Sequence, residues 1–344
     1  MKKIVLFPLA FFVSIVLVLC VSAQAETIKL RVGHDLPPFT TPGMGIDAWA
    51  KEVNTRTEGR VVVEVFPANA LAEQKSAIEM MQSGVVDGYM ISLGVHRRLF
   101  PVSAVFSLFG LGFPDTVEGY LAHAKTFSDF IEKYQPIAKE LKDFKLIFDI
   151  INSNNILLST KPGIRLPTDL KGLKLGSTGT GIELAKRMGG AGVFCIPHQA
   201  YQKLQTGVID AIPIHFLAAG EFKLFEVAKY VYDLPWGQSE LPFFMCKSSW
   251  NKISAKDQKI ILDAGIVGQR VTFEAGAERT IQGRQAFIDS GATIAEPTKE
   301  ERAQWEKEFS FFWDQWVAEC EAAGIKTARD ILNDWKDAAY ASWE

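Results

Sequence analysis

The residues best suited to bind a small molecule lie in a glycine-rich stretch, Asp169 to Gly181, which reads DLKGLKLGSTGTG. A glycine-rich turn between a short strand and a helix can direct backbone N–H groups at an anion, as nucleotide-binding loops do. The order here is G-x-x-G-x-G, which is not the dinucleotide fingerprint, and no Lys-Ser/Thr pair completes a P-loop. We therefore expect Gly176, Ser177 and Thr178 to present backbone N–H groups and hydroxyls to a small ligand.

Signatures of catalysis and of metal binding are scarce in this chain. It has no H-E-x-x-H and no G-x-S-x-G, and its five histidines, at 34, 96, 123, 198 and 215, show no metal spacing. The cysteines form no C-x-x-C motif. We predict no catalytic residue, no metal site and no cofactor. An enzyme with an unrecognised carboxylate pair stays open as an alternative, because Asp and Glu occur throughout the sequence.

Length and charge limit the class of protein. The 344 residues exceed what one hydrophobic core usually organises, so two domains are expected. With 48% hydrophobic residues, 22% charged residues and a net charge of -3, the chain has a globular composition without a basic field. Nucleic acid is therefore excluded as an expected partner.

The amino terminus reads as an export signal. Lys2 and Lys3 precede an apolar run from Ile4 to Val21, and Ala23-Gln24-Ala25 forms an A-x-A cleavage site. We expect residues 1–25 to be removed before Glu26, which makes the mature protein periplasmic. A retained membrane anchor is the alternative, since the apolar run has about the minimum spanning length. Three of the four cysteines would remain, and whether Cys195 and Cys246 meet is left open.

Short β-type runs alternate with helical segments along the mature chain, which predicts an α/β fold with two βαβ-type units. QSGVVDG and QTGVIDA each place a glycine, Gly84 and Gly207, where a helix ends and a strand begins. The expected strands are IKLRVGH, RVVVEVFP, VVDGYMIS, FKLIFDII, ILLST, GLKLG, GVFCI, VIDAIPI and YVYDLP. The expected helices cover 46–57, 72–81, 115–142, 182–188, 200–205 and 218–225.

The region after Asn251 predicts long helices. Ser254 with Asp257 resembles a capping box, and no proline follows before Pro297, so one helix is expected over 255–289. Thr298 with Glu301 forms a second capping box. The expected buried face of the first helix is Ile260, Ala264, Val267, Val271 and Ala275, and the aromatic stripe of the second, expected to be core, is Trp305, Phe309, Phe312, Trp313 and Trp316.

Several ordered blocks carry a resemblance to a known family. The blocks are Gly33 with its following loop, Gly59-Arg60 through VEVFP, LAEQKSAIEMMQSGVVDG (71–88), LPTDLKGLKL (166–175), AYQKLQTGVIDA (200–211) and FEVAKY (225–230). Along essentially the whole mature chain, the sequence resembles the solute-binding proteins of tripartite ATP-independent periplasmic (TRAP) transporters, the DctP-type family. The resemblance implies capture of one small organic solute by hinge closure and its presentation to the membrane permease subunits.

The same resemblance implies a two-lobed periplasmic-binding-protein fold, type II-like, with a long helix spanning both lobes. Lobe I is expected to comprise residues 26–151 with about 239–270. Lobe II is expected to comprise residues 152–238 with about 271–297, and the helices of 298–344 to pack on the lobes. We expect a monomer.

The sequence departs from the family at the positions that usually grip an organic acid. In the family an arginine usually follows the strand ending LKL and pairs with a carboxylate, and here Gly176 stands there. A second arginine is replaced at Asn155 and Ile156, and an asparagine four residues after Asp210 is replaced by Ile214. Because a buried carboxylate without a compensating charge costs several kcal/mol, we expect a neutral, partly aromatic or cationic solute rather than a simple carboxylate.

The expected ligand-binding residues come from both lobes and from the segments between them. They are Asp35, Met90, Ile91, Ser92, Asn155, Ile156, Gly176, Ser177, Thr178, Pro197, Ile214, His215 and Trp236. Three of them have alternative roles. Asp35 can cap the following helix instead of pairing with a cation, His215 can be a satisfied histidine at the cleft wall, and Trp236 can pack the hinge.

Two further points stay open. Arg165 and Arg187 either reach an acid by another route or face solvent. A solute-sensing partner of a membrane receptor and an exported enzyme remain as alternatives to a transport protein.

Overall fold

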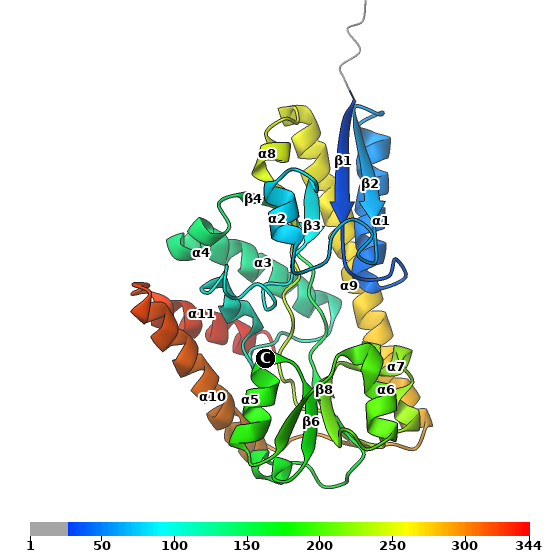
Figure 1. The fold of residues 1–344 in the computed structure, drawn as a ribbon, viewed down its shortest axis with the longest axis vertical. Coiled ribbons are helices and arrows are strands. Elements are labelled where there is room, and N and C mark those ends of the chain that lie inside the picture. Colours follow the sequence, from blue (N-terminus) through cyan, green and yellow to red (C-terminus); the bar gives the residue numbers. More distant parts are fainter. Residues whose placement is uncertain (1–26) are drawn as a thin grey trace, which may run out of the picture.

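The computed structural model describes residues 27–344, and the expected leader with its cleavage site lies outside the described residues. Within that part of the chain, no helix is long and apolar enough to cross a membrane. The molecule has two α/β lobes, one above the other in Figure 1. This agrees with the predicted fold class.

Lobe I is built on a five-stranded sheet of order β2-β1-β3-β10-β4. The strands are β1 (Ile28–Gly33), β2 (Val61–Phe66), β3 (Gly88–Met90), β4 (Phe144–Phe148) and β10 (Phe243–Cys246). Strands β1, β2 and β3 are parallel, while β10 runs antiparallel to both β3 and β4. The accompanying helices are α1 (Thr41–Arg56), α2 (Ala77–Gln82), α3 (Val117–Lys133), α4 (Gln135–Glu140) and the short α8 (Lys247–Trp250).

Lobe II is built on a six-stranded sheet of order β11-β9-β5-β8-β6-β7. The strands are β5 (Ile156–Ser159), β6 (Lys174–Ser177), β7 (Ala191–Phe194), β8 (Ala211–Ile214), β9 (Tyr230–Tyr232) and β11 (Thr293–Ala295). Strand β6 is parallel to β7 and β8, and β5 is antiparallel to β8 and β9. The helices are α5 (Gly179–Arg187), α6 (Pro197–Gln205) and α7 (Phe216–Glu221).

The two sheets repeat one connection pattern. Reading β7-β6-β8-β5-β9 beside β2-β1-β3-β10-β4 shows three parallel strands followed by one antiparallel strand in each lobe. Gly84 and Gly207, which follow α2 and α6, have φ of 75° and 68°. These are left-handed conformations that glycine adopts without steric cost, so the predicted helix-to-strand turn occurs once in each lobe.

Two segments between the lobes complete the chain path. Residues 149–155 lead from β4 in lobe I to β5 in lobe II, and residues 233–242 lead back from β9 to β10. We call them the connectors. They pair with each other through the backbone, for example Leu241 N to Ile150 O at 2.9 Å and Asn155 N to Gly237 O at 3.0 Å. The hinge therefore consists of two chain segments that are hydrogen-bonded to each other.

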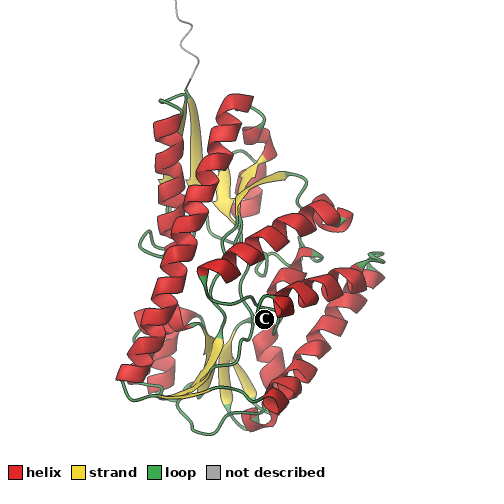
Figure 2. Ribbon diagram, turned by 180° about the vertical axis from the view of Figure 1, so that it is seen from behind, coloured by secondary structure: helices red, strands yellow, loops and turns green. Residues whose placement is uncertain are grey.

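The predicted long helix is α9 (Ala255–Asp289), which begins at the expected cap, Ser254, and runs along both lobes in Figure 2. It contacts α1 in lobe I and α7 in lobe II. Its predicted buried face is wrong, because of the five expected residues only Ala264 is buried. The buried face includes Gly265, Gly268 and Gly283 instead, because α9 packs closely on strand β4 and on helices α1 and α7, where a Cβ atom would meet the facing backbone.

The carboxy-terminal helices α10 (Lys299–Ala322) and α11 (Ala328–Ala341) pack beside the lobes. The predicted capping box at Thr298 is confirmed: its side chain accepts from the Glu301 N–H at 3.2 Å, and the Glu301 carboxylate accepts from the Thr298 N–H at 2.8 Å. The predicted aromatic stripe is buried throughout, which confirms it as core.

The expected helix over 115–142 is two helices rather than one. α3 ends at Lys133 and α4 begins at Gln135, with Pro136 in the first turn of α4. A proline cannot donate the hydrogen bond that a helix interior needs, so it fits the first turn of a new helix. The cysteines 195, 246 and 320 are free and buried, and Cys195 does not bond to Cys246.

Candidate functional site

The polar residues of the candidate site follow the carboxyl ends of parallel strands in both lobes. In lobe I, Asp35 comes after β1 and Ser92 after β3. In lobe II, Thr178, Pro197 and His215 come after β6, β7 and β8. Carboxyl ends of parallel strands share one edge of a sheet, which is where open α/β sheets bind ligands.

A residue that the sequence analysis missed, Gln74, joins the lobe I part of the site. Its amide nitrogen donates to Asp35 Oδ1 at 3.2 Å and to the Met90 carbonyl at 3.2 Å. Its amide oxygen accepts from the Ser92 N–H at 3.1 Å. Three predicted residues are thereby held together by one carboxamide. Nothing in the spacing of Gln74 marks it, because its partners are 16 to 39 residues away.

Asp35 is half-buried and lies next to a buried histidine. Burial raises the pKa of the Asp35 carboxyl, against smaller opposing effects of hydrogen bonds from its own backbone and from Gln74. The alternative role of Asp35 as the cap of α1 is wrong, because Thr40 caps that helix and accepts from the Gly43 N–H. The Asp35 carboxylate therefore does not cap α1.

His34, directly before Asp35, is fully buried, and neither ring nitrogen has a partner with hydrogen-bond geometry among the described residues. Burial lowers its pKa to about 4, so the ring is neutral at pH 7. His96 contacts Gln74, with Nε2 2.7 Å from the Gln74 carbonyl. This contact joins residues that are 22 positions apart, so the sequence did not indicate it.

The connector residues Asn155 and Trp236 are paired through their backbones, with Trp236 N 2.8 Å from Asn155 O. The Trp236 side chain is 1% exposed and packs on α10, with ring centroids 5.0 Å from Trp305 and 5.6 Å from Phe309. The structure therefore places the indole in the hinge core. The Asn155 side chain is half-buried.

Three other predicted residues have core side chains. Ile156 and Ile214 are paired across β5 and β8 and lie in the lobe II core, and Met90 lies in the lobe I core. Ile91, beside Met90, is also fully buried. These positions leave mainly backbone groups for a ligand.

Gly176 lies in β6, where little room exists for a side chain. A Cβ atom added there would be 2.6 Å from Ile209 Cδ1 and 3.1 Å from Cys195 Cβ. Both neighbours belong to the lobe II core. At the position where the family resemblance implies an arginine, Ile209 packs closely against the strand.

The loop after β6 presents polar groups at the beginning of α5. Ser177 is half-buried, Thr178 and Pro197 are exposed, and Thr178 precedes α5 without making a side-chain cap. The first-turn N–H groups of α5 are therefore not used by a capping side chain, and such groups favour a negative or electron-rich partner.

His215 caps α7, since its Nδ1 accepts from the Ala218 N–H at 3.1 Å. Burial lowers the pKa of His215 to about 4, which keeps the ring neutral and Nδ1 able to accept. The ring is thus satisfied by the fold, as the alternative role supposed.

Arginines 165 and 187 pair with acids of α10. Arg165 forms an ion pair with Glu301, and Arg187 pairs with Glu308 at 3.5 Å while its guanidinium lies 3.5 Å from the Phe311 ring centroid. Arg279 of α9 is the guanidinium beside the β1–α1 loop: it donates to the Phe39 carbonyl at 2.9 Å and pairs with Glu221 at 3.0 Å. It ties a lobe I loop to lobe II.

The site is assembled in two separate parts in this structure. Among residues 27–344, no direct hydrogen bond joins Asp35, Gln74 or Ser92 to the lobe II residues of the site. A pocket of about 490 Å³ lies nearby between Phe39, α7 and α9, and it is lined by none of the predicted ligand-binding residues. A ligand that touched both parts would bridge the two lobes.

Comparison with known proteins gives one consistent result. The model of the family described as bacterial extracellular solute-binding protein, family 7, matches residues 32–319. A solute-binding protein of Chromohalobacter salexigens is 27% identical over 318 residues, which is 90% of this chain and 91% of that protein. The C4-dicarboxylate-binding periplasmic protein DctP of Rhodobacter capsulatus is 27% identical over 298 residues, covering 85% of this chain and 87% of that protein.

Solved structures agree on the fold. A TRAP periplasmic solute-binding protein of Desulfovibrio salexigens has a TM-score of 0.80 at 24% identity, covering 91% of this chain and 95% of that one. A marine metagenome TRAP solute-binding protein specific for aromatic acids, in complex with metahydroxyphenylacetate, has a TM-score of 0.78 at 19% identity, covering 92% and 100%.

Proposed function

Because this chain belongs to the bacterial extracellular solute-binding proteins, family 7, we propose that it captures a small organic solute between its lobes and delivers it to the membrane subunits of a TRAP transporter. The family match over residues 32–319 carries this proposal. The polar residues at the carboxyl ends of parallel strands in both lobes support it. We further propose that residues 1–25 direct export to the periplasm and are cleaved before Glu26, and that the lobe boundaries follow the division predicted above.

We propose that the solute carries a cationic or hydrogen-bond-donating group rather than relying on a carboxylate. The carboxylate of Asp35, held by Gln74, would accept from that group. Ser177, Thr178 and the first turn of α5 would contact the opposite end of the solute through hydroxyls and N–H groups. Uncharged contacts and aromatic surface would supply the remaining affinity.

The names of two similar proteins point to the opposite ligand class, organic acids. DctP of Rhodobacter capsulatus is named for C4-dicarboxylates, and the marine protein is specific for aromatic acids. Calorimetry on the mature chain with matched acids, alcohols and amines separates the two cases. We expect an alcohol or amine to bind more tightly than the acid of the same carbon skeleton. Tight binding of simple dicarboxylates would contradict the proposed ligand class while leaving solute binding intact.

A designed variant tests the missing guanidinium. In Gly176→Arg with Ile209→Val, valine lacks the Cδ1 atom that would lie 2.6 Å from the new Cβ, which removes the closest of the clashes at this position. We expect this double variant to gain carboxylate binding that the Ile209→Val control lacks. A well-folded double variant with no gain would show that position 176 does not face the ligand.

A further inference from the structure

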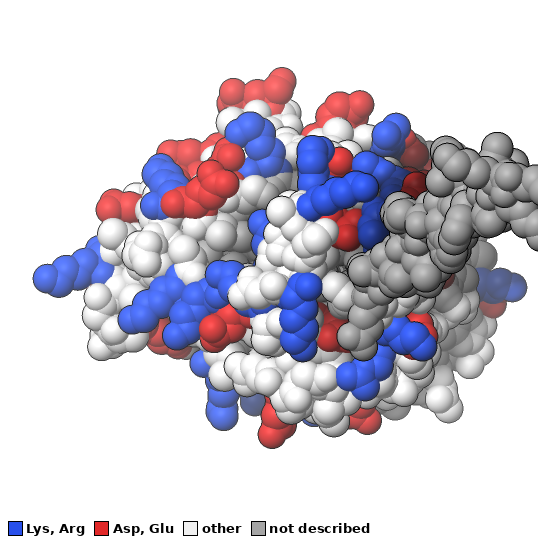
Figure 3. Space-filling model, turned by 90° about the horizontal axis from the view of Figure 1, so that it is seen from above, with Lys and Arg blue, Asp and Glu red and all other residues white. Residues whose placement is uncertain are grey.

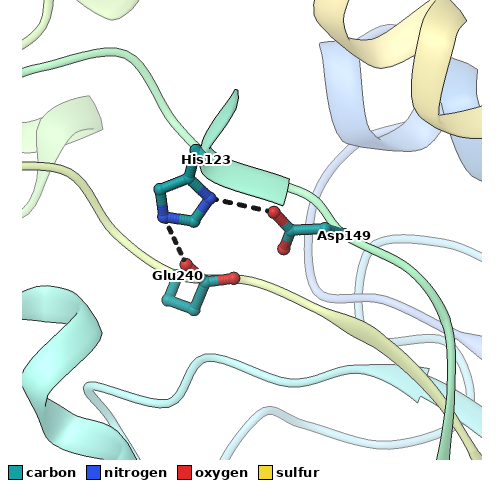
Figure 4. Close-up of side chains that lie close together, drawn as sticks. All are labelled: His123, Asp149 and Glu240. Carbon is teal, nitrogen blue, oxygen red and sulfur yellow. Dashed lines mark hydrogen bonds and ion pairs between the residues drawn. The ribbon is translucent and has the colours of Figure 1, made fainter. Parts of the chain in front are cut away.

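Three ionisable side chains meet in the hinge, far along the sequence from one another. His123 of α3 lies between Asp149 and Glu240, and all three are at most 2% exposed. Nδ1 of His123 is 3.0 Å from Asp149 Oδ2 with hydrogen-bond geometry, and Nε2 is 3.0 Å from Glu240 Oε2 as an ion-pair contact. Figure 4 shows the ring between the two carboxyl groups.

The two carboxyl groups belong to different connectors. Asp149 begins the connector from β4 to β5, and Glu240 lies in the connector from β9 to β10. Glu240 also forms a backbone bridge with Ile151. One imidazole on a lobe I helix therefore contacts both chain crossings between the lobes.

The same region ties the third crossing, α9, to these connectors. Gln269 of α9 accepts from the Asp149 N–H at 3.1 Å. Thr280 of α9 lies 2.6 Å from the Ser153 hydroxyl, which in turn is 2.9 Å from the Tyr120 hydroxyl of α3. All three segments that join the lobes are thus linked to the neighbourhood of α3.

The contacts are those of a paired imidazole rather than of a metal centre, although one ligand atom from each of the three residues lies within 4.8 Å of the others. Cation ligands converge on one point, whereas the two ring nitrogens of His123 point to carboxyl groups on opposite edges of the ring. A doubly protonated imidazole would place one N–H toward Asp149, where the contact has hydrogen-bond geometry, and one toward Glu240, 3.0 Å away. The ring is also packed against aromatic side chains, with centroids 5.0 Å from Phe113 and 5.2 Å from Trp335, and aromatic rings favour a cation.

We propose that His123 is a positioning residue of the hinge, whose imidazolium holds the two connectors together and so sets the separation of the lobes. Asp149 is the ionised partner, because its contact with the ring has hydrogen-bond geometry and that of Glu240 has not. Burial and the Asp149 charge oppose ionisation of Glu240, so we assign the negative charge of the cluster to Asp149 and the retained proton to Glu240. This role does not depend on which solute the protein binds.

The titration of the cluster follows from its contacts. Burial lowers the pKa of His123, but Glu240 and Asp149 together raise it to about 9. Burial and the Asp149 charge raise the pKa of Glu240, while hydrogen bonds from Glu240 and His123 outweigh burial and lower that of Asp149. The other groups around the ring, from the 107–113 loop, α3, α9 and α11, are uncharged: Ser107, Phe113, Phe127, Gln269 and Trp335. Asp115, before α3, contacts the same connectors through Asn154 and Gln238.

Because the pKa of His123 is raised, its contact with the connectors should weaken as pH increases. With a folded-state pKa of about 9, the ring stays protonated at neutral pH and loses its proton as pH rises through about 9. The contribution of the imidazolium to stability is complete below about 6.5, the ordinary histidine value, and is lost over the same rise. Interlobe distances therefore report on the proposal without any ligand. Spin labels on Glu79→Cys in α2 and Lys186→Cys in α5 place one probe on each lobe at exposed positions, and the native thiols are buried.

We expect His123→Gln and Asp149→Asn to broaden the interlobe distance distribution at pH 7, and Glu240→Gln, which has the shape of the neutral acid, to leave it unchanged. In the unsubstituted chain, the distribution should broaden reversibly between pH 7 and pH 10, and this pH effect should vanish in His123→Gln. An interlobe distance distribution that changes neither with pH nor in His123→Gln would overturn the proposal.

A second measurement uses the unsubstituted chain and therefore does not depend on the folding of a variant. Nitrogen NMR of the mature chain at pH 7.5 reads the protonation of each imidazole ring directly, with the exposed His198 as internal reference. We expect both ring nitrogens of His123 to be protonated. A neutral His123 ring, or one stoichiometric Zn²⁺ bound in place of the proton, would overturn the proposal even if solute binding is established.

Discussion

Single residues in this protein acquire their roles from partners far away in the chain. Asp35 would be an ordinary loop carboxylate, but Gln74 fixes one of its oxygens, and burial raises its pKa. Gly176 would be an ordinary loop glycine, but Ile209 and Cys195 occupy the space that a side chain would need. The chemistry of the candidate site is therefore set by these neighbours.

Asp35→Asn tests the proposed electrostatic contact with the solute. The change removes the charge and keeps the shape, so a charge-assisted hydrogen bond of roughly 1.5–3 kcal/mol is lost and Kd rises about 10- to 100-fold. Calorimetry with the best-binding amine or alcohol measures it. Asp47→Asn, an exposed carboxylate on α1, is the control and should leave Kd unchanged. An unchanged Kd in Asp35→Asn would remove Asp35 from the site.

His34→Leu tests the cost of burying an imidazole without partners. Replacing an unsatisfied polar group by an apolar one of similar size should raise the free energy of unfolding at pH 7 by about 1 kcal/mol. Because burial lowers the pKa of His34 to about 4 in the folded state, the unfolded chain binds a proton at this residue more readily. The free energy of unfolding of the wild type is therefore unaffected by the protonation of this residue above about pH 6.5 and decreases as pH falls toward 4. Urea unfolding across this range should show a smaller loss in His34→Leu than in wild type, because buried His215 contributes a loss of its own in both proteins. His198→Leu, at an exposed position, should keep the wild-type profile.

At the scale of elements, α9 is positioned by close helix crossings. A Cβ atom on Gly45 of α1 would lie 2.6 Å from the Gly268 carbonyl and would also meet Thr272. A Cβ atom on Gly220 of α7 would lie 2.8 Å from Cα of Gly283. One helix is thus pressed against a helix of each lobe, and its buried face consists largely of small residues.

Gly45→Ala and Gly276→Ala form a matched pair on these helices. Alanine normally stabilises a helix interior by up to about 1 kcal/mol over glycine. At position 276 the new Cβ would be 3.5 Å from Tyr120, an ordinary contact, so this variant should be neutral or more stable. At position 45 the overpacking should instead lower the free energy of unfolding by roughly 1–3 kcal/mol. Equal effects in urea unfolding would contradict the close crossing.

At the scale of the molecule, the two lobes and the carboxy-terminal helices share one hydrophobic cluster. Tyr89 of lobe I, Leu175 of lobe II, Trp305 of α10 and Trp335 of α11 all belong to it. Trp236, on a connector, lies in the same cluster. The surface seen in Figure 3 carries interspersed basic and acidic residues without a broad field of one sign, as the composition suggested.

A shared core predicts cooperative unfolding. Because neither lobe can expose its part of the cluster without exposing the other, calorimetry of the mature chain should show one transition instead of two. Removing residues 298–344 should abolish that transition, because it strips Trp305 and Trp335 from the core. Two well-separated transitions in the intact chain would show that the lobes are independent.

Much of the fold was predictable because its signals are local. The caps at Ser254 and Thr298, the glycines 84 and 207, and the aromatic stripe of α10 each depend on residues a few positions apart. The break before Pro136 also has a local signal, the proline itself, but the surrounding helical pattern led to the prediction of one continuous helix. The buried face of α9 was not predictable from apolar spacing, because close crossings select glycine rather than large apolar residues.

The sequence by itself determined the order of strands and helices, the caps at Ser254 and Thr298 and the family, since each is encoded in short blocks of neighbouring residues. Only the tertiary structure decided that Gln74 holds Asp35, that Ile209 fills the space beside Gly176, and that His123 joins the two connectors. The physical reason is that these contacts join residues distant in sequence. Their energies depend on burial and on the exact meeting of side chains, which exist only once the chain has folded.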